Sequence, residues 1–154
     1  MLVAAATSIL LALGVSMYRT YSVRTQIATS VGEIRAAQLL VVAAFRKSGT
    51  LPLDAPATGI DETAHKLLAG RYVESLAVAN GRIDITFGRE ASPAIASETL
   101  SLTPFETVDE HVVWICGNES PGVGLKPLGF ASGALQAVHV TTTIDDRYLP
   151  PSCR

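Results

Sequence analysis

The first seventeen residues, Met1 to Met17, carry no charge, and a helical pattern continues from them without a break to Lys47. No proline occurs before Pro52, so the sequence predicts one uninterrupted helix of roughly 70 Å at 1.5 Å per residue. The remaining chain is too short to cover a helix of this length. We therefore expect the C-terminal half of the helix to pack on a globular head and the N-terminal half to protrude.

The apolar segment, residues 1–17, spans about 26 Å as a helix, slightly less than the hydrocarbon core of a bilayer. A cleavable signal peptide is the alternative, but it would begin with basic residues, and here the first basic residue, Arg19, follows the apolar run. This order favours a membrane anchor. The side chains expected to face lipid, or other copies of the helix, are Leu2, Val3, Ile9, Leu10, Leu11, Leu13 and Val15.

Residues 18–48 form the amphipathic half of the predicted helix. Apolar residues spaced three, four or seven apart mark one helical face that should pack on the head, namely Ile27, Val31, Ile34, Val41 and Phe45. Leu39, Leu40 and Val42 are expected to widen this stripe. The helix should end near residue 48, because Gly49 suits a left-handed cap and Pro52 prevents continuation.

After a connecting segment, residues 49–70, with a turn of helix across 62–68, the apolar period changes to two over the head, residues 71–154. Asn80-Gly81 is a strong hairpin signal between the first two strands. The four predicted antiparallel strands are 71–78, 82–87, 99–105 and 111–116. A fifth short strand is expected at 138–142, within a segment rich in glycine and proline. The sequence thus predicts an α+β fold with a helix against one face of a meander.

The chain contains two cysteines, Cys116 and Cys153. An even number in the head of a membrane-anchored chain indicates one disulfide if the head is exported, and it would close the loop 116–153 and contribute roughly 4 kcal/mol on the chain-entropy model. Two unpaired buried thiols are the alternative.

Several local sequences have the order and spacing of motifs in one known protein family. Tyr18, Tyr21 and Arg24 resemble the tyrosine pair and basic residue that end the hydrophobic segment of a pilin. Residues 72–81 resemble the first hairpin of the sheet of a type IV pilin. Residues 114–117 and 149–154 resemble the two ends of that family's disulfide-bounded region. The resemblance covers essentially the whole chain, and it implies the pilin fold with a C-terminal disulfide-closed loop.

The resemblance also implies a function. The chain would be a major or major-like structural subunit of a type IV pilus, a helical homopolymer assembled by dedicated machinery through the hydrophobic helix. It would reside in the bacterial inner membrane before assembly and in an extracellular fimbrium afterwards. The fibre would serve in adhesion to a host surface, twitching motility or DNA uptake.

One departure from the family concerns the N-terminus. Aligning the tyrosine pair places Met1 near the seventh position of a mature pilin, so the leader, its cleavage site and the glutamate at the fifth position are not seen. Arg19 and Arg24 would also favour a cytoplasmic C-terminal side, in conflict with an exported head. Both observations lead us to expect further residues upstream of a misassigned start. The alternative is a copy that cannot be processed and is not a normal subunit.

Other roles remain open from the sequence. A minor pilin that binds DNA or a surface ligand is the main alternative, although only Lys126, Arg147 and Arg154 are basic after Cys116. A type II secretion pseudopilin fits less well because of the predicted disulfide. An ordinary membrane anchor would use the same apolar segment.

We predict no enzyme activity, cofactor, metal or small-molecule substrate. His65, His111 and His139 lack the spacing of metal ligands, and no serine lies in a G-x-S-x-G context. Asp145-Asp146 with the neighbouring threonines is better read as a solvated turn than as a calcium loop. The glycine-rich stretch 117–133 lacks a phosphate-loop pattern, and Trp114 is expected to pack beside the disulfide.

Overall fold

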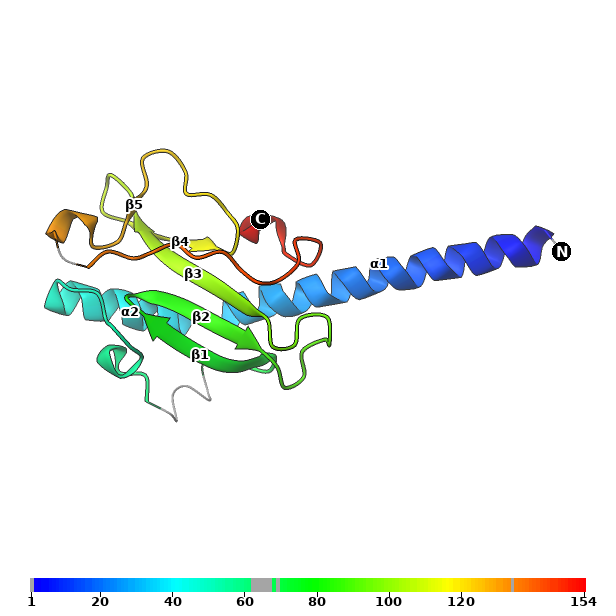
Figure 1. Ribbon diagram of the computed structural model, residues 1–154, viewed down its shortest axis with the longest axis horizontal. Helices are drawn as coiled ribbons and strands as arrows, with labels where there is room; N and C mark the ends of the chain where they lie inside the picture. The colour runs from blue at the N-terminus through cyan, green and yellow to red at the C-terminus, as the bar shows by residue number, and fades with distance from the viewer. Residues whose placement is uncertain (1, 62–67, 69, 134) are drawn as a thin grey trace.

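The protruding helix and the head are both present in the computed structural model, which describes residues 2–61, 68, 70–133 and 135–154. Side chains are described from Gly14 onward, apart from residues 16 and 132. Figure 1 shows the helix entering the head along the back of the sheet, with its N-terminal half extending away from the head. The turn of helix predicted across 62–68 lies outside the described residues, apart from Leu68.

Two helices, α1 (Leu2–Glu33) and α2 (Arg35–Ser48), replace the single predicted helix. They are separated by Ile34 alone, whose ψ of 3° departs from helical geometry. Gly32 lies two residues earlier, and its low helix propensity weakens the helix at this point. The hydrogen bonds nevertheless continue, from Ile34 N–H to Ser30 O and from Gln38 N–H to Ile34 O, both at 3.1 Å. The two helices therefore act as one rod with a local irregularity.

The C-terminal end of α2 is closed as the sequence predicts. Gly49 adopts the left-handed conformation with φ of 72°, and its N–H donates to the carbonyl of Phe45 at 2.8 Å. Arg46 and Lys47 occupy the last turn, where positive charge interacts favourably with the negative end of the helix dipole.

The sheet is antiparallel, with strand order β1-β2-β3-β4. Its strands are β1 (Val73–Ala79), β2 (Arg82–Phe87), β3 (Thr99–Glu106) and β4 (Val112–Cys116). The four predicted strands are therefore confirmed, with small shifts at their ends. The first begins at Val73 rather than at residue 71, because the two preceding residues form a turn.

The β1–β2 hairpin turns at Asn80 and Gly81, both with positive φ, of 50° and 76°. This is the geometry that the Asn-Gly pair favours. The turn is also anchored outside the hairpin, because Gly81 N–H donates to the carbonyl of Pro52 at 2.8 Å. The connecting segment is thereby tied to the tip of the sheet.

A short strand that the sequence analysis missed, β5 (Lys126–Pro127), pairs with the end of β3. Among the described residues there are also three single-turn 3-10 helices: η1 (Pro56–Thr58), η2 (Phe130–Ser132) and η3 (Pro151–Cys153). Two residues that include a proline give no alternating pattern, so β5 could not be recognised from the sequence.

The strand predicted at 138–142 does not form. The last residue of this segment instead contacts the start of β3 through its side chain, since the Thr142 hydroxyl donates to the carbonyl of Thr99 at 2.7 Å. Thr99 N–H in turn donates to the Thr143 hydroxyl at 2.9 Å. One backbone bond accompanies them, from Thr143 N–H to the carbonyl of Thr99 at 3.1 Å. Two threonine hydroxyls and this single bond are thus found where a strand would form a ladder.

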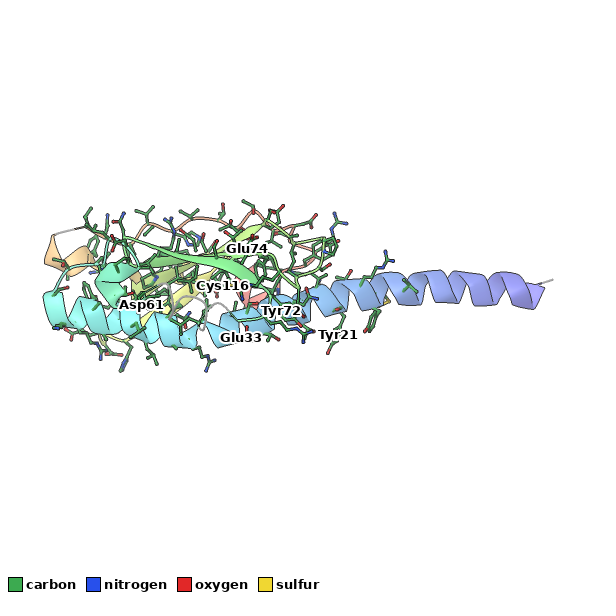
Figure 2. All side chains as sticks on the ribbon, turned by 90° about the horizontal axis from the view of Figure 1, so that it is seen from below. Tyr21, Glu33, Asp61, Tyr72, Glu74 and Cys116 are labelled. Carbon is green, nitrogen blue, oxygen red and sulfur yellow. A yellow bond between two sulfur atoms is a disulfide. The ribbon has the colours of Figure 1, made fainter. Side chains whose placement is uncertain are left out.

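The core lies between the rod and the sheet (Figure 2). Alternate residues of β2 and β3 point towards the helix and are buried, namely Ile83, Ile85, Phe87, Leu100 and Leu102. A smaller cluster, formed by Leu51, Leu128 and Ala137, packs with Phe45 and Val112 near the C-terminal end of α2. The sheet therefore holds the rod along one face only.

Candidate assembly surface

The part of α1 outside the head forms the most distinctive surface of the molecule. Where side chains are described, this part exposes large apolar and aromatic residues: Val15 at 53%, Met17 at 75%, Tyr18 at 71% and Tyr21 at 70%. The other residues predicted to face lipid or the filament core, namely Leu2, Val3, Ile9, Leu10, Leu11 and Leu13, lie in the helical backbone of α1. An apolar helix exposed to water on this scale needs a partner surface.

The side chains predicted to pack on the head are distributed between two clusters. Ile27, Ile34 and Val41 are completely buried in the main core, and Val31 packs against it while partly buried. Phe45 instead packs against the smaller cluster. The C-terminal half of the rod is thus held along its whole length.

The buried stripe contains further residues that the sequence analysis missed. Val23, Ser30 and Ala37 are buried as fully as their neighbours. Together with the three completely buried residues they occupy positions 23, 27, 30, 34, 37 and 41, alternating steps of four and three. That regular spacing was available in the sequence: Val23 is apolar and lies four residues before Ile27, so it could have been included. A search for large apolar residues passes over Ser30 and Ala37.

The predicted widening of the stripe is wrong for two residues. Leu39 is 71% exposed and Leu40 37% exposed, because the sheet contacts only one side of α2. Val42 is half-buried.

Hydrogen bonds hold α1 at the point where the helix leaves the head. The guanidinium of Arg24 donates through Nε and Nη2 to the backbone carbonyl of Arg147, at 3.0 and 2.8 Å. The side-chain oxygen of Gln26 accepts a hydrogen bond from Ser92 N–H at 2.8 Å. These bonds come from two loops that are 55 residues apart in the sequence, so the helix is fixed from both sides.

A groove borders α1 beside each of these contacts. One, of about 530 Å³, has apolar walls formed by Tyr21, Ala28, Pro150 and Pro151, among others. The second, of about 610 Å³, is bordered by Tyr18, Val23, Pro93 and Tyr148, among others. Both are open, so neither resembles a catalytic pocket; they are surfaces on which another polypeptide could pack.

The C-terminal loop is closed by the Cys116–Cys153 disulfide, as predicted. Gly117 follows the first cysteine with φ of +59°, and a Cβ there would lie 2.7 Å from the carbonyl oxygen of Cys153. Asn118 N–H donates to that same carbonyl at 2.9 Å. The end of β4 and the chain terminus are therefore joined both covalently and by close backbone packing.

Asp145 and Asp146, considered above for calcium, each have a partner within the chain. Asp145 pairs with Arg147 at 2.7 Å, and this hydrogen bond lowers the pKa of Asp145 from 3.8 to about 2. Asp146 accepts a hydrogen bond from the Asn118 amide at 2.7 Å. Both carboxylates thus stabilise the loop that carries the carbonyl bound by Arg24.

The remaining candidates for chemistry do not come together. In the described ranges, no group of three or more His, Cys, Asp and Glu side chains is placed to hold a metal ion. His111 lies in the turn before β4, whereas the ring of His139 stacks edge-on with Phe105 at 6.3 Å. His65 lies outside the described residues. Trp114, on β4, packs partly against the core and partly borders the groove between β4 and α2.

By length and composition, the helical stretch Met17–Ser48 could also cross a membrane, as judged on the described side chains. Part of that stretch is buried in the head, and core helices of soluble proteins share this property. It is weak evidence for a membrane anchor.

The comparison with known families agrees with the geometry. Residues 23–154 match the pilin family of bacterial filament proteins, so that all of the head and the packed half of the rod lie within the match. The chain therefore belongs to the pilin family and is a subunit of a bacterial filament. No curated protein matches the chain. The family match and the C-terminal disulfide together support the resemblance to type IV pilins described above.

Proposed function

We propose that this protein is a major or major-like subunit of a type IV pilus and that it polymerises through the N-terminal half of α1. The observation that carries the proposal is the continuity of an exposed apolar helix with a helix locked into the head. Because the two halves form one rod, packing of the apolar halves places every head on the outside of a fibre.

The driving force is the burial of apolar area. A surrounded apolar helix of the length of residues 1–17 buries on the order of 1,500 Å², which corresponds to tens of kcal/mol before the entropic costs of association. A bilayer covers the same surface before assembly, so the subunit would reside in the inner membrane first and then be incorporated into an extracellular fibre. Assembly machinery would supply the work of extraction.

The test is the recovery of the protein from the cell surface. Sheared filaments should contain the chain as an abundant component, detected by mass spectrometry and by immunogold labelling of fibres. If the chain stays in the membrane fraction while type IV pili are produced without it, the proposed role as a major pilus subunit is wrong. Low abundance within fibres would instead identify a minor pilin that binds DNA or a surface ligand.

The use of the fibre is a separate question. We propose adhesion, twitching motility or DNA uptake, the uses implied by the resemblance to type IV pilins. Deletion of the gene should abolish at least one of these three activities, measured by surface attachment, by colony spreading and by transformation. Complementation with the full chain is the control.

A further inference from the structure

A second apolar surface lies on the head, far from the protruding helix. Between α2 and the edge strand β4 runs an open groove of about 500 Å³. We call it the α2–β4 groove, and it is lined by Arg35, Gln38, Leu39, Val42, Arg46, His111, Val112 and Trp114. Leu39 is 71% exposed in the middle of its helical face, although leucine gains most by burial.

The charges of this groove are of one sign. Its lining includes two arginines and no acidic residue. In the described part of the chain, neither Arg35 nor Arg46 has a carboxylate partner. The whole chain has a net charge of −2, so a basic apolar groove stands out on an acidic protein. An occupant should therefore present an apolar side chain flanked by carboxylates.

The same chain presents such a segment in the turn between β3 and β4. Val108 is 86% exposed, and it is followed by the exposed residues Asp109 and Glu110, which form none of the ion pairs found among the described residues. The turn has a defined shape, because Thr107 N–H donates to the carbonyl of His111 at 2.9 Å and Glu110 N–H to the carbonyl of Thr107 at 3.0 Å. We call this segment, residues 107–110, the acidic turn.

The acidic turn cannot enter the groove of its own molecule, because His111 directly follows it and already lines the groove. It lies at the end of the groove near the C-terminus of α2, where Val112 and Phe45 pack on one cluster. Reaching the middle of an identical groove therefore requires a second molecule displaced along the axis of α2. Leu39 and Arg46 are seven residues apart, or about 10 Å along that axis.

We propose that the acidic turn of one subunit docks into the α2–β4 groove of a neighbouring copy, with Val108 against Leu39 and Asp109 and Glu110 facing Arg46 and Arg35. The two surfaces are different, so the contact is heterologous, and repeating it with an axial displacement gives an open helical array rather than a closed dimer. This inference rests on the proposed function, since it requires that the chain polymerise. It assigns a specific contact between heads, in addition to the packing of the apolar helices.

A charge exchange tests this contact in the full chain, expressed in cells that make fibres. The single variants Arg46→Glu and Asp109→Lys should each lower the ratio of sheared-fibre protein to membrane protein by about tenfold, because each places like charges together at the contact. The double variant should restore most of the ratio. Lys47→Glu is the matched control, since it removes the same charge from the same helical turn but lies on a different face, beside Thr50 and Leu51. It should leave the ratio unchanged.

The outcomes separate this inference from the proposed function. If the unmodified chain forms fibres but Arg46→Glu behaves like Lys47→Glu, or if the double variant is no better than the single ones, the contact is wrong and the proposed function stands. If the unmodified chain never enters fibres, both fail. Thermal unfolding of each purified variant shows whether the head is intact. If one single variant is unstable, the other single variant, compared with Lys47→Glu, retains the test.

Discussion

The guanidinium of Arg24 holds the backbone carbonyl of Arg147 through two hydrogen bonds, of 3.0 and 2.8 Å, across 123 residues of sequence. This contact joins the helix at its exit from the head to the loop that precedes the C-terminal disulfide. Because any residue can provide a carbonyl, the specificity lies in Arg24 and in the shape of the loop. The loop in turn owes its shape to Asp145 and Asp146.

Replacing Arg24 should therefore loosen this loop without unfolding the head. For Arg24→Met, which keeps the apolar stem of the side chain but removes the donors, we expect a loss of about 1 kcal/mol, at the low end for a charged hydrogen bond because the site is exposed. Hydrogen exchange of the amides of residues 144–149 should become faster. Arg19→Met, on the same helix, is the control, and equal exchange in both variants would contradict the assigned role.

The disulfide should contribute most of the stability of the C-terminal segment. For the double variant Cys116→Ser, Cys153→Ser we expect a loss of about 3–4 kcal/mol, because the cross-link removes conformational freedom from the unfolded chain. Thermal unfolding with and without a reductant measures this loss, and the reductant should have no effect on the double variant. Two free thiols in the exported protein, detected by mass spectrometry, would show that the bridge does not form in the cell.

Gly117 should tolerate no side chain. In Gly117→Ala the new Cβ combines an unfavourable left-handed backbone with a contact of 2.7 Å to the carbonyl of Cys153, and we expect a loss of about 2–3 kcal/mol. Gly124→Ala is the matched control, since φ there is +88° but no atom lies within 4 Å of the added Cβ. It should lose only the backbone contribution, about 1 kcal/mol. Equal losses in a denaturant titration would remove the steric argument.

The pKa of Asp145 gives a dependence on pH with a defined sign. Its folded-state pKa is about 2, below the ordinary 3.8, so its pairing with Arg147 stabilises the fold above about pH 4 and is lost as the pH falls through 2. The difference in melting temperature between Asp145→Asn and the unmodified chain should be constant from about pH 5 to 8 and should disappear near pH 2. A difference that changes between pH 5 and 8 would point to another group.

The sequence was sufficient for the parts of this fold that follow from periodicity and turn chemistry. Gly49 closes α2, and Asn80-Gly81 forms the first hairpin, because few other residues favour these backbone conformations. The four long strands show their alternation of apolar and polar residues. These features are local, so they are readable without knowledge of tertiary contacts.

The features that could not be read depend on contacts between distant segments. Leu39 resembles the buried residues of its helix in type, and only the position of the sheet shows that it faces outward. The segment 138–142 has the composition of a strand, but Thr99 is already bonded by the Thr142 and Thr143 side chains. No sequence pattern indicated that Arg24 binds the loop at Arg147, because its partner is a backbone carbonyl, which every residue carries.

Ser30 offers a last test, of the packing between the rod and the head. Its side chain is completely buried on the stripe, and its hydroxyl has no hydrogen-bond partner among the described residues. A buried hydroxyl without a partner costs about 1–3 kcal/mol, and alanine is the better helix former, so Ser30→Ala should stabilise the head by about 1 kcal/mol. Ser22→Ala, at a half-buried position of the same helix, should gain only the helix propensity, a few tenths of a kcal/mol. Denaturant titration measures both, and a destabilised Ser30→Ala would mean that this hydroxyl is bonded in solution.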